Sequence, residues 1–548
     1  MSKNIYDLIV VGGGVNGCGI ARDAAIRGLK VMLVEKGDFS AGTTWASSGM
    51  IHGGPRYLLD DINITKRSCT DSGYIQKIVP HLIFRIPFFM TVLKTGIAPV
   101  DWFMLEATKT FTEVYDHYQP LKGGKPSLKF SAEQVSRIEP LIKADLKGAI
   151  SFDEYGIDCP RLCLVNALDA KERGATVYNH TEVIEFLKTD SAVTGVRLKH
   201  RDGSVEDAFA QVVVNATGPW APQTANMAGG NVKLRPAKGV HIIYPGRVSN
   251  FAITFSTADG RMIFIMPHEN ISMLGTTDDD FYGDPDDIHV LWDEVRYLHE
   301  AAARIIPAIE RLRPMRVIAG IRPTIFEWGK LEDKLTRDHD IVDHGKTDNL
   351  DGLYSMIGGK LASYREMSEE MVDVVMKKLG RTAPCQSHKL SMPGGDAQSD
   401  PKALAETYGQ PLAVTRRLAF RHGSRAQRVL ELMKEKPAYS RIIDHDEPVT
   451  EAEIRYVIRE EMAFTIGDIT RRTRLGDGPT QGRDSVFAAG VILGEELGLS
   501  TQQVLDEVQT WFNRRWKEQH AVMKGSMAQA VNIQASLADV FAQREGRQ

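Results

Sequence analysis

The stretch that decides the fold is Asp7-Leu-Ile-Val-Val-Gly-Gly-Gly-Val-Asn-Gly-Cys-Gly-Ile-Ala-Arg22. It opens with an apolar run of buried-strand length, and glycines in G-x-G-x-x-G spacing follow at Gly12, Gly14 and Gly17. A helical pattern comes next, and a second apolar run ends at Glu35. Strand, glycine turn, helix, second strand and terminal acid together form the βαβ fingerprint of a dinucleotide-binding domain.

Each glycine has its own physical role in this fingerprint. Gly12 permits a tight turn, Gly14 lets the backbone approach a pyrophosphate, and Gly17 lets the helix pack closely on the strand. The N-terminus of the helix then presents free N–H groups and partial positive charge to the phosphates. Glu35 stands where a carboxylate accepts hydrogen bonds from ribose hydroxyls. The motif predicts a bound dinucleotide and leaves the choice between NAD and FAD open.

A second stretch favours FAD. Val212-Val-Val-Asn-Ala-Thr-Gly218 combines a buried strand with a turn of small residues. Flavoproteins with two dinucleotide-binding domains carry such an A-T-G turn where the chain returns beside the flavin nucleotide. The alternative is an ordinary turn between a strand and a loop.

The composition describes a globular protein of more than one domain. The chain has 548 residues, of which 43% are hydrophobic and 25% charged, and its net charge of −4 gives no argument for nucleic acid. Five scattered cysteines without a signal peptide indicate a reducing cytosol. Cys159 and Cys163 could be half of a metal site, but helix packing is favoured and no metal is expected. No apolar run reaches the ~20 residues of a transmembrane helix.

The segment after Glu35 is the first candidate for substrate chemistry. Residues 43–58 are rich in glycine and small hydroxyl residues, so that the backbone can approach a ligand. His52, Arg56 and Tyr57 are its reactive or anion-binding members. A plain loop with a surface arginine is the alternative, and closeness to the nucleotide motif favours the functional interpretation.

These motifs together resemble the FAD-dependent glycerol-3-phosphate dehydrogenase family, whose relatives include the glycerophosphate oxidases and the D-amino-acid-oxidase-like flavoproteins. The resemblance rests first on the fingerprint, on Ala46-Ser-Ser48 and on His52-Gly-Gly-Pro-Arg-Tyr57. It continues in family order over roughly the first 390 residues. The further matching motifs are Asn215-Ala-Thr-Gly-Pro-Trp220, Pro236-Ala-Lys-Gly-Val-His241, Gly275-Thr-Thr277, Gly320-Ile-Arg-Pro323, Thr336-Arg-Asp338 and Gly358-Gly-Lys-Leu-Ala-Ser-Tyr-Arg365.

The resemblance implies FAD as cofactor and indicates its contacts residue by residue. They fall in the fingerprint, in the loop after it, in the A-T-G turn and before the last helix of the nucleotide domain. The cofactor-binding residues expected are Gly12, Gly14, Val15, Asn16, Gly17, Glu35, Lys36, Thr43, Ala46, Ser47, Ser48, Val183, Ala216, Thr217, Gly218, Trp220, Gly359, Lys360 and Leu361.

The implied substrate combines a phosphate dianion with a secondary alcohol. Phosphate favours guanidinium groups, which bind it bidentately and stay charged. The alcohol must lose its proton as hydride leaves carbon for flavin N5, and His52 and Lys360 are the candidates to receive or polarise that proton. Which of the two is the base stays open, and His241 is equally well explained as a satisfied core histidine. The catalytic residues expected are His52, Lys360 and Arg322, and the substrate-binding residues expected are Arg56, Tyr57, His241, Arg322, Arg337 and Lys360.

The predicted fold class is α/β, α+β overall, with three domains. A Rossmann-like FAD-binding domain is expected from residues 1–75, 146–232 and 330–385. An antiparallel-sheet substrate domain is expected from residues 76–145 and 233–329, because residues 233–325 alternate apolar and polar. The apolar stretch 80–93 could touch a membrane, but a buried strand of this domain is favoured. Residues 386–548 are expected to be a helical domain.

The C-terminal region resembles that of the anaerobic-type large subunits of the family, which carry a cysteine-ligated iron–sulfur cluster. The matching positions here are Asp444, Asp446, Thr480 and Ser485. Clusters need thiolates or imidazoles as ligands, so a helical scaffold without a cluster is expected. The basic run 471–474 is interpreted as a solvated or packing face, and the acidic stretches 278–280 and 284–287 as solvated loops.

The expected function is oxidation of sn-glycerol 3-phosphate to dihydroxyacetone phosphate, with electrons passed to quinone or to a partner redox protein. The expected location is cytoplasmic, with peripheral attachment to the inner face of the membrane as an option, in a homodimer or a larger complex. Three alternatives stay open: a dehydrogenase of another polyol phosphate, an oxidase that makes peroxide, and a non-catalytic assembly subunit that holds FAD.

Overall fold

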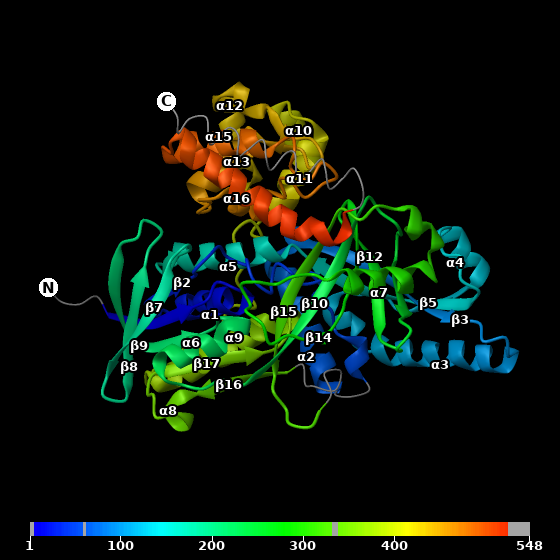
Figure 1. Ribbon diagram of the computed structural model, residues 1–548, viewed down its shortest axis with the longest axis horizontal. Coiled ribbons are helices and arrows are strands. Elements are labelled where there is room, and N and C mark those ends of the chain that lie inside the picture. The colour runs from blue at the N-terminus through cyan, green and yellow to red at the C-terminus, as the bar shows by residue number, and fades with distance from the viewer. Residues whose placement is uncertain (1–4, 59–61, 331–337, 524–548) are drawn as a thin grey trace.

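The protein is described here by a computed structural model that covers residues 5–58, 62–330 and 338–523. Two sheets lie side by side along the long axis of the molecule, and the C-terminal helices lie above them (Figure 1). The first sheet holds the nucleotide fingerprint, and the second holds the segment that was expected to bind substrate. The α/β fold class with a helical C-terminal part is confirmed.

The first sheet is a mainly parallel sheet built around the fingerprint strand. Its order is β16-β17-β9-β1-β2-β6, and β8 pairs with β9 and with β7. Val11 at the end of β1 lies opposite Val34 of β2 and Asn215 of β9, so the carboxyl ends of three strands meet beside the glycine turn. The strands are β1 (Ile5–Val11), β2 (Val31–Val34), β6 (Thr176–Tyr178), β7 (Glu182–Thr189), β8 (Ala192–Lys199), β9 (Val205–Asn215), β16 (His339–Asp343) and β17 (Leu353–Gly358). Ligands bind at such carboxyl ends in open α/β sheets.

The second sheet is largely antiparallel, as the alternating pattern predicted. Its order is β14-β10-β13-β12-β11-β3-β5-β4, and β15 pairs with the opposite edge of β10, along Leu234 to Ile243. The strands are β3 (Ile83–Leu93), β4 (Leu128–Ser131), β5 (Leu146–Ile157), β10 (Leu234–Pro245), β11 (Ala252–Ser256), β12 (Met262–His268), β13 (Ile271–Gly275), β14 (Asp279–Asp280) and β15 (Arg316–Ile325). Residues 83–93 of the apolar stretch form β3 inside this sheet, which confirms the buried-strand interpretation.

One expectation about strands was wrong. β5 pairs with β3 and β4 in the second sheet, so residues 146–157 do not belong with the nucleotide fold as the boundary at 146 implied. Between β6 and β7 the chain turns at His180, which has a φ of 50°. The remaining division into domains stays a prediction.

Helices cover both sheets, and a separate group of helices forms the C-terminal part. α1 and α5 pack together against the nucleotide sheet, and Cys159 and Cys163 are buried in α5, which confirms their packing role. The helices of the two-sheet part are α1 (Val15–Ile26), α2 (Ile62–Ile78), α3 (Ala98–Asp116), α4 (Ala132–Ile138), α5 (Cys159–Glu172), α6 (Ala221–Ala228), α7 (Trp292–Ala303), α8 (His344–Thr347) and α9 (Tyr364–Lys378).

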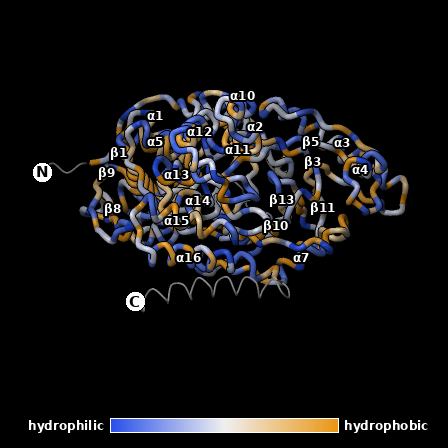
Figure 2. Tube along the Cα trace, turned by 90° about the horizontal axis from the view of Figure 1, so that it is seen from above, coloured by the Kyte–Doolittle hydropathy of each residue, from blue (hydrophilic) through white to orange (hydrophobic). Residues whose placement is uncertain are grey.

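The C-terminal part has a hydrophobic core of its own, as the helical pattern predicted. Its helices are α10 (Pro401–Tyr408), α11 (Leu412–His422), α12 (Ala426–Glu435), α13 (Glu451–Glu460), α14 (Ile466–Thr473), α15 (Val486–Leu497) and α16 (Thr501–Gln519). A short hairpin of β18 (Ile442–Asp444) and β19 (Val449–Thr450) precedes α13. Figure 2 looks down on this part and shows it over the nucleotide domain, with α1 and α5 beside it.

Buried ion pairs attach the C-terminal part to the nucleotide domain. The Asp38 carboxylate, just after Glu35, accepts from Arg471 Nε at 2.6 Å and from Arg472 Nη1 at 2.7 Å. Arg474 Nη2 lies 3.0 Å from Asp158 Oδ1, at the N-terminus of α5. The basic run is therefore a packing face and not a solvated one.

Replacing Asp38 with asparagine should destabilise the protein strongly. The change leaves two buried guanidinium groups without their shared counter-charge, and breaking a buried pair in this way costs about 3–5 kcal/mol. The midpoint of thermal unfolding should fall accordingly. Asp286→Asn is the control, because Asp286 forms an exposed pair with Lys36 and its loss should cost about 1 kcal/mol or less. Equal midpoints for the two variants would contradict the assigned interface.

Candidate active site

A cavity of about 770 Å³ lies at the carboxyl ends of the nucleotide strands. Its walls come from the β1–α1 turn, residues 41–47, the A-T-G turn, residues 358–361 and strand β15. The loop 284–290 and residues 514–518 of α16 complete it. Of the residues expected to bind the cofactor, all line this cavity except Gly17 and Ser48.

The three fingerprint glycines stand in surroundings that fit their predicted roles. Gly12 has a φ of +110°, and a Cβ there would lie 2.7 Å from the Ala216 carbonyl oxygen. A Cβ on Gly17 would lie 1.8 Å from the Gly12 oxygen, so only glycine lets the helix begin this close to the turn. By contrast, a Cβ on Gly14 would meet only Thr44 Oγ1 at 3.6 Å. The Gly14 backbone therefore faces open space that a ligand can approach.

Glu35 is held at the cavity wall by backbone donors. Its two carboxylate oxygens accept from the N–H groups of Gly13 at 2.6 Å and Gly37 at 2.7 Å. Burial raises the pKa of this carboxyl group, and these two hydrogen bonds act in the opposite direction. Lys36 next to it pairs with Asp286 at 2.7 Å and lies over the Trp220 ring, 4.6 Å from its centre.

The residues present fit a dinucleotide. The cavity volume falls within the range of about 300–1,000 Å³ that small-molecule sites occupy. It joins an open glycine turn at a helix N-terminus to a fixed carboxylate, the pattern for a pyrophosphate and a ribose. Val183, expected near the adenosine half, also lines it.

A second group of predicted residues lies beside the cavity on one face of the second sheet. Arg322 Nη1 is 2.7 Å from Asp278 Oδ1, and Nη2 donates to Thr276 Oγ1 at 3.1 Å. His241 Nε2 is 3.0 Å from Ser48 Oγ. Burial, with Arg322 nearby, lowers the pKa of His241 to about 3, so its ring is neutral. The structure thus brings Ser48, His241 and Arg322 into one region.

The register of β10 and β15 explains this grouping. Arg322 lies opposite Ala237, and Gly320 lies opposite Gly239, so these residues share a face of the sheet. A Cβ on Gly320 would lie 2.5 Å from Ala46 Cβ, so the loop that carries Ala46 packs on that face. Arg322 itself does not line the cofactor cavity; it lies next to it.

Lys360 lines the cavity, and its Nζ is buried. Its backbone is extended (φ −134°, ψ 153°), and a short 3₁₀ turn, Leu361–Ser363, separates it from α9. Two glycines with positive φ, Gly358 and Gly359, place the chain in this path. The Lys360 ammonium also affects the pKa of Cys69 in α2. Burial raises the pKa of that thiol to about 11, and the positive charges of Lys122 and Lys360 act in the opposite direction.

His52 lies in the loop 51–54, partly exposed. The next peptide N–H, that of Gly53, donates to Glu154 Oε2 at 3.3 Å. Arg56 and Tyr57 fall in a 3₁₀ turn, Pro55–Leu58, and the described structure does not extend to their side chains. Arg337 lies outside the described residues, so its predicted phosphate contact stays a prediction.

Sequence reasoning missed the acidic loop and the C-terminal helix at the cavity mouth. Asp286 and Asp287 are not merely solvated, since they pair with Lys36 and with Lys517 of α16 at 2.7 Å and 3.2 Å. Asp278 pairs with Arg322 in the same way. No local motif marks such pairs, because each joins segments far apart in the chain.

The four positions that replace cluster cysteines lie together in two bonded pairs. Asp444 Oδ2 accepts from Ser485 Oγ at 3.1 Å, and Asp446 Oδ2 accepts from the Thr480 N–H at 2.6 Å. A hydroxyl-to-carboxylate and an amide-to-carboxylate hydrogen bond therefore join these positions.

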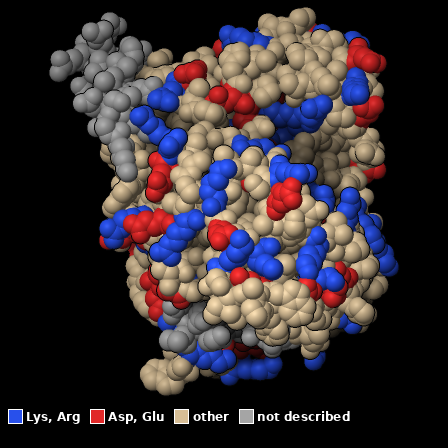
Figure 3. Space-filling model, turned by 90° about the vertical axis from the view of Figure 1, so that its right-hand side faces the viewer, with Lys and Arg blue, Asp and Glu red and all other residues tan. Residues whose placement is uncertain are grey.

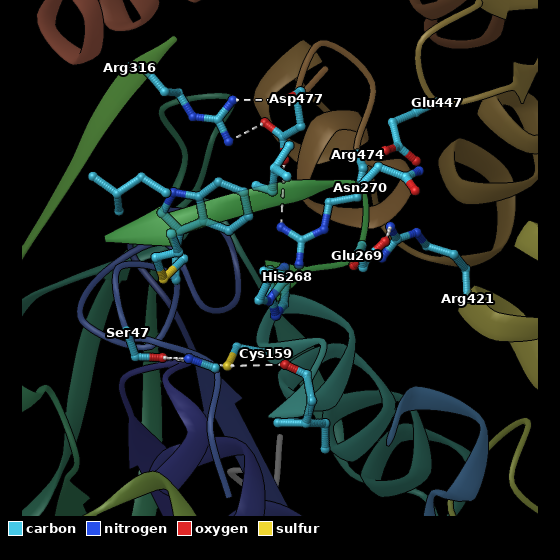
Figure 4. Close-up of a pocket in the computed structure, with 17 residues that line it drawn as sticks. Ser47, Cys159, His268, Glu269, Asn270, Arg316, Arg421, Glu447, Arg474 and Asp477 are labelled. Atoms are coloured by element: carbon cyan, nitrogen blue, oxygen red, sulfur yellow. Dashed lines mark hydrogen bonds and ion pairs between the residues drawn. The ribbon is translucent and has the colours of Figure 1, made fainter. Parts of the chain in front are cut away.

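A smaller cavity of about 50 Å³ adjoins the first and shares Trp45, Ser47 and Ile318 with it. Its charged side chains neutralise one another: Figure 4 shows Arg316 pointing at Asp477, which lies 3.0 Å from Arg316 Nη2. Arg421 and Glu269 form a second pair at 2.5 Å. These contacts attach the C-terminal part to the second sheet.

Comparison with known proteins gives a consistent result. Residues 7–354 match the family described as FAD dependent oxidoreductase, and residues 385–504 match the C-terminal domain of alpha-glycerophosphate oxidase. Subunit A1 of the anaerobic glycerol-3-phosphate dehydrogenase of Haloferax volcanii is 33% identical to this chain. The alignment covers 96% of this chain and 89% of that subunit. The corresponding anaerobic glycerol-3-phosphate dehydrogenase subunit of Escherichia coli K12 is 30% identical over 93% of this chain and 92% of its own. The structure of the glycerol-3-phosphate dehydrogenase from Bacillus halodurans complexed with FAD superimposes on this one with a TM-score of 0.77. The two sequences are 26% identical, and the match covers 96% of this chain and 97% of that chain.

Proposed function

The chain belongs to the FAD-dependent glycerol-3-phosphate dehydrogenase family, and from this premise we propose that it oxidises sn-glycerol 3-phosphate to dihydroxyacetone phosphate. The observation that carries the proposal is the meeting of two groups of residues. A dinucleotide cavity with Lys360 in its wall adjoins a sheet face that holds Arg322 and His241. Anaerobic reduction of the bound flavin by this substrate is the experiment that tests it.

FAD would be held by the glycine turn, Glu35, the A-T-G turn and residues 359–361, and when bound it supplies the acceptor for two electrons. Arg322 binds the phosphate, together with Arg56 and Arg337, because guanidinium groups stay charged and pair bidentately with phosphate oxygens. Oxidation of the secondary alcohol removes the C2 hydrogen with its electron pair and also removes the hydroxyl proton. His52 or Lys360 receives or polarises that proton. His241, neutral and bonded to Ser48, orients the substrate without adding charge.

The electrons then pass to quinone or to a partner redox protein. Two of the relatives are named as subunits, which supports operation within a complex, with a homodimer as the other arrangement. An oxidase would instead deliver the electrons to oxygen. Reoxidation of the reduced flavin by a quinone analogue without stoichiometric peroxide supports the dehydrogenase, and stoichiometric peroxide supports the oxidase.

We assign peripheral membrane contact to helix α3. No helix in the described residues is long and apolar enough to cross a bilayer. The N-terminal half of α3 nevertheless exposes a group of apolar side chains, in which Trp102 is 58% and Phe103 63% exposed. Ile97, Val100 and Met104 are exposed beside them. Figure 3 looks onto the end of the molecule where α3 lies in Figure 1, and there basic and acidic residues alternate with uncharged surface. An aromatic, apolar helix face of this kind inserts at the boundary of headgroups and acyl chains.

Trp102→Glu together with Phe103→Glu should abolish sedimentation with vesicles of mixed neutral and anionic lipids. Two carboxylates on this face make insertion unfavourable, while the sheet beneath stays intact. Val205→Glu, at another exposed apolar position, is the control and should leave sedimentation unchanged. Wild-type protein that does not sediment with vesicles, or a double variant that sediments equally, would contradict peripheral attachment through α3.

A further inference from the structure

We propose that Tyr115, Lys122 and Glu154 form a buried positioning network that fixes the loop carrying His52, and that this network sets the rate of substrate oxidation and not substrate affinity. The inference rests on the proposed function, because it assigns His52 to the reacting end of the substrate. The three residues come from α3, from the turn after it and from β5, and no sequence motif marked them.

Glu154 is the centre of the network. Its side chain is 2% exposed. Oε1 accepts from the Tyr115 hydroxyl at 2.5 Å, and Oε2 accepts from Lys122 Nζ and from the Gly53 N–H. Lys122 Nζ also donates to Tyr115 Oη at 3.0 Å and to the Asp153 carbonyl at 2.8 Å. Both oxygens of a buried carboxylate are thus satisfied, as such a group requires.

The bond to Gly53 connects this network to the candidate base. The Gly53 N–H belongs to the peptide unit that joins His52 to Gly53, so its direction determines the backbone orientation at His52. No side chain fits at Gly53, because a Cβ there would lie 2.2 Å from Cys69 Sγ and 2.3 Å from Tyr115 Oη. The network therefore contacts the loop backbone directly.

The preceding part of the loop is held by neutral bonds that do not involve the network. Ser72 Oγ donates to the Ile51 carbonyl at 2.7 Å, and the Ile51 N–H donates to the Tyr155 carbonyl at 3.0 Å. Both bonds fix the residue before His52. The Glu154 bond fixes the peptide after it, so the two sets of bonds hold His52 from opposite sides.

The same network lies close to Lys360, the other candidate for the proton. Cys69 is a shared neighbour, since Tyr115 approaches its Sγ and both Lys122 and Lys360 act on its thiol. The network and Lys360 therefore both border α2 at Cys69. Glu154 and Lys122 balance each other in charge, so the network orients the loop without adding a net charge to the site.

The network's placement also predicts what it does not affect. Arg322, which binds the phosphate, lies on β15 and is held by Asp278 and Thr276. The bonds of Glu154 and Lys122 described above run instead to α3, to β5 and to the His52 loop. Losing the network should slow the chemical step and leave phosphate recognition intact.

The test uses two full-length double variants that differ in one property. Lys122→Met with Glu154→Gln and Lys122→Met with Glu154→Leu both replace the buried pair with uncharged side chains of similar size, which folded proteins tolerate. Only glutamine offers an oxygen that can accept from the Gly53 N–H. The readouts are FAD content, KM for sn-glycerol 3-phosphate, and the rate constant of flavin reduction at saturating substrate.

We expect the glutamine variant to stay within about threefold of wild type in that rate constant, and the leucine variant to be slower by at least about tenfold. KM should stay within about threefold in both. Tyr115→Phe removes one hydrogen bond to Glu154 and keeps the ion pair, so it tests the positioning role even if a double variant fails to fold. Tyr244→Phe is its control, because it removes a hydrogen bond from another buried tyrosine, to His299. Tyr115→Phe should slow reduction and Tyr244→Phe should not.

Equal rates for the glutamine and leucine variants, or a change confined to KM, would overturn the positioning role. Equal effects of Tyr115→Phe and Tyr244→Phe would overturn it as well. A wild-type flavin that sn-glycerol 3-phosphate does not reduce would instead overturn the proposed function itself, and the two failures are therefore told apart by the wild-type trace.

Discussion

Lys360→Met is expected to slow reduction of the flavin by saturating sn-glycerol 3-phosphate by about 10²–10⁴-fold, the range that a positioned acid or base contributes. Lys360 lines the cofactor cavity, its Nζ is buried, and its extended backbone directs the chain from the nucleotide sheet to the site. Methionine keeps the length of the side chain and removes the ammonium, so FAD should stay bound.

Lys378→Met is the matched control. Lys378 belongs to the helix that follows Lys360 and forms a partly exposed pair with Asp351. Its replacement should leave both flavin content and reduction unchanged. His52→Gln should produce a loss comparable to that of Lys360→Met if His52 takes the proton, and a smaller one if it only orients the alcohol. Wild-type rates of flavin reduction in both Lys360→Met and His52→Gln would contradict the proposed proton transfer.

Arg322→Ala should raise KM for sn-glycerol 3-phosphate by about 10–150-fold, which corresponds to the 1.5–3 kcal/mol of a hydrogen bond to a charged group. The guanidinium is fixed by Asp278 and Thr276, so little motion is needed before it meets the phosphate. Removing it also takes away the guanidinium that pairs with Asp278, whose carboxylate would repel the dianion. FAD content should be unchanged, and the weak oxidation of unphosphorylated glycerol should change little.

Arg235→Ala is the control for this prediction. Arg235 lies on the neighbouring strand β10 and pairs with Asp280 at 2.8 Å, a similar arginine–aspartate pair. Its loss should leave KM within about twofold, the effect of a partly exposed pair. If Arg322→Ala keeps the wild-type KM and kcat/KM, the arginine is structural, and the assignment of a phosphorylated substrate loses its main support.

Much of the fold followed from local sequence. The fingerprint, the alternating strands and the C-terminal helices are short-range patterns, and each produced the expected element. The placement of β5 did not follow, because its partner β3 lies far away in the chain and pairing is decided by long-range contacts. The burial of Arg471 and Arg472 did not follow either, since an arginine that pairs with a distant Asp38 has the same local sequence as one in water.

The site likewise contains residues that motifs predict and residues that only the folded chain brings together. Motif residues such as Gly12, Glu35 and Thr217, chosen from their spacing and from the resemblance, line the cavity. Glu154 and Lys122, and Lys517 at the cavity mouth, could not be found in this way, because each acts across segments that meet only in the folded chain.

The most direct test of the proposed activity is an anaerobic titration of the purified protein with sn-glycerol 3-phosphate, followed by the visible absorbance of the flavin. We expect full bleaching by stoichiometric substrate, formation of one dihydroxyacetone phosphate per flavin, and little bleaching by unphosphorylated glycerol. A flavin that stays oxidised with sn-glycerol 3-phosphate, or that another polyol phosphate bleaches far more readily, would contradict the proposal.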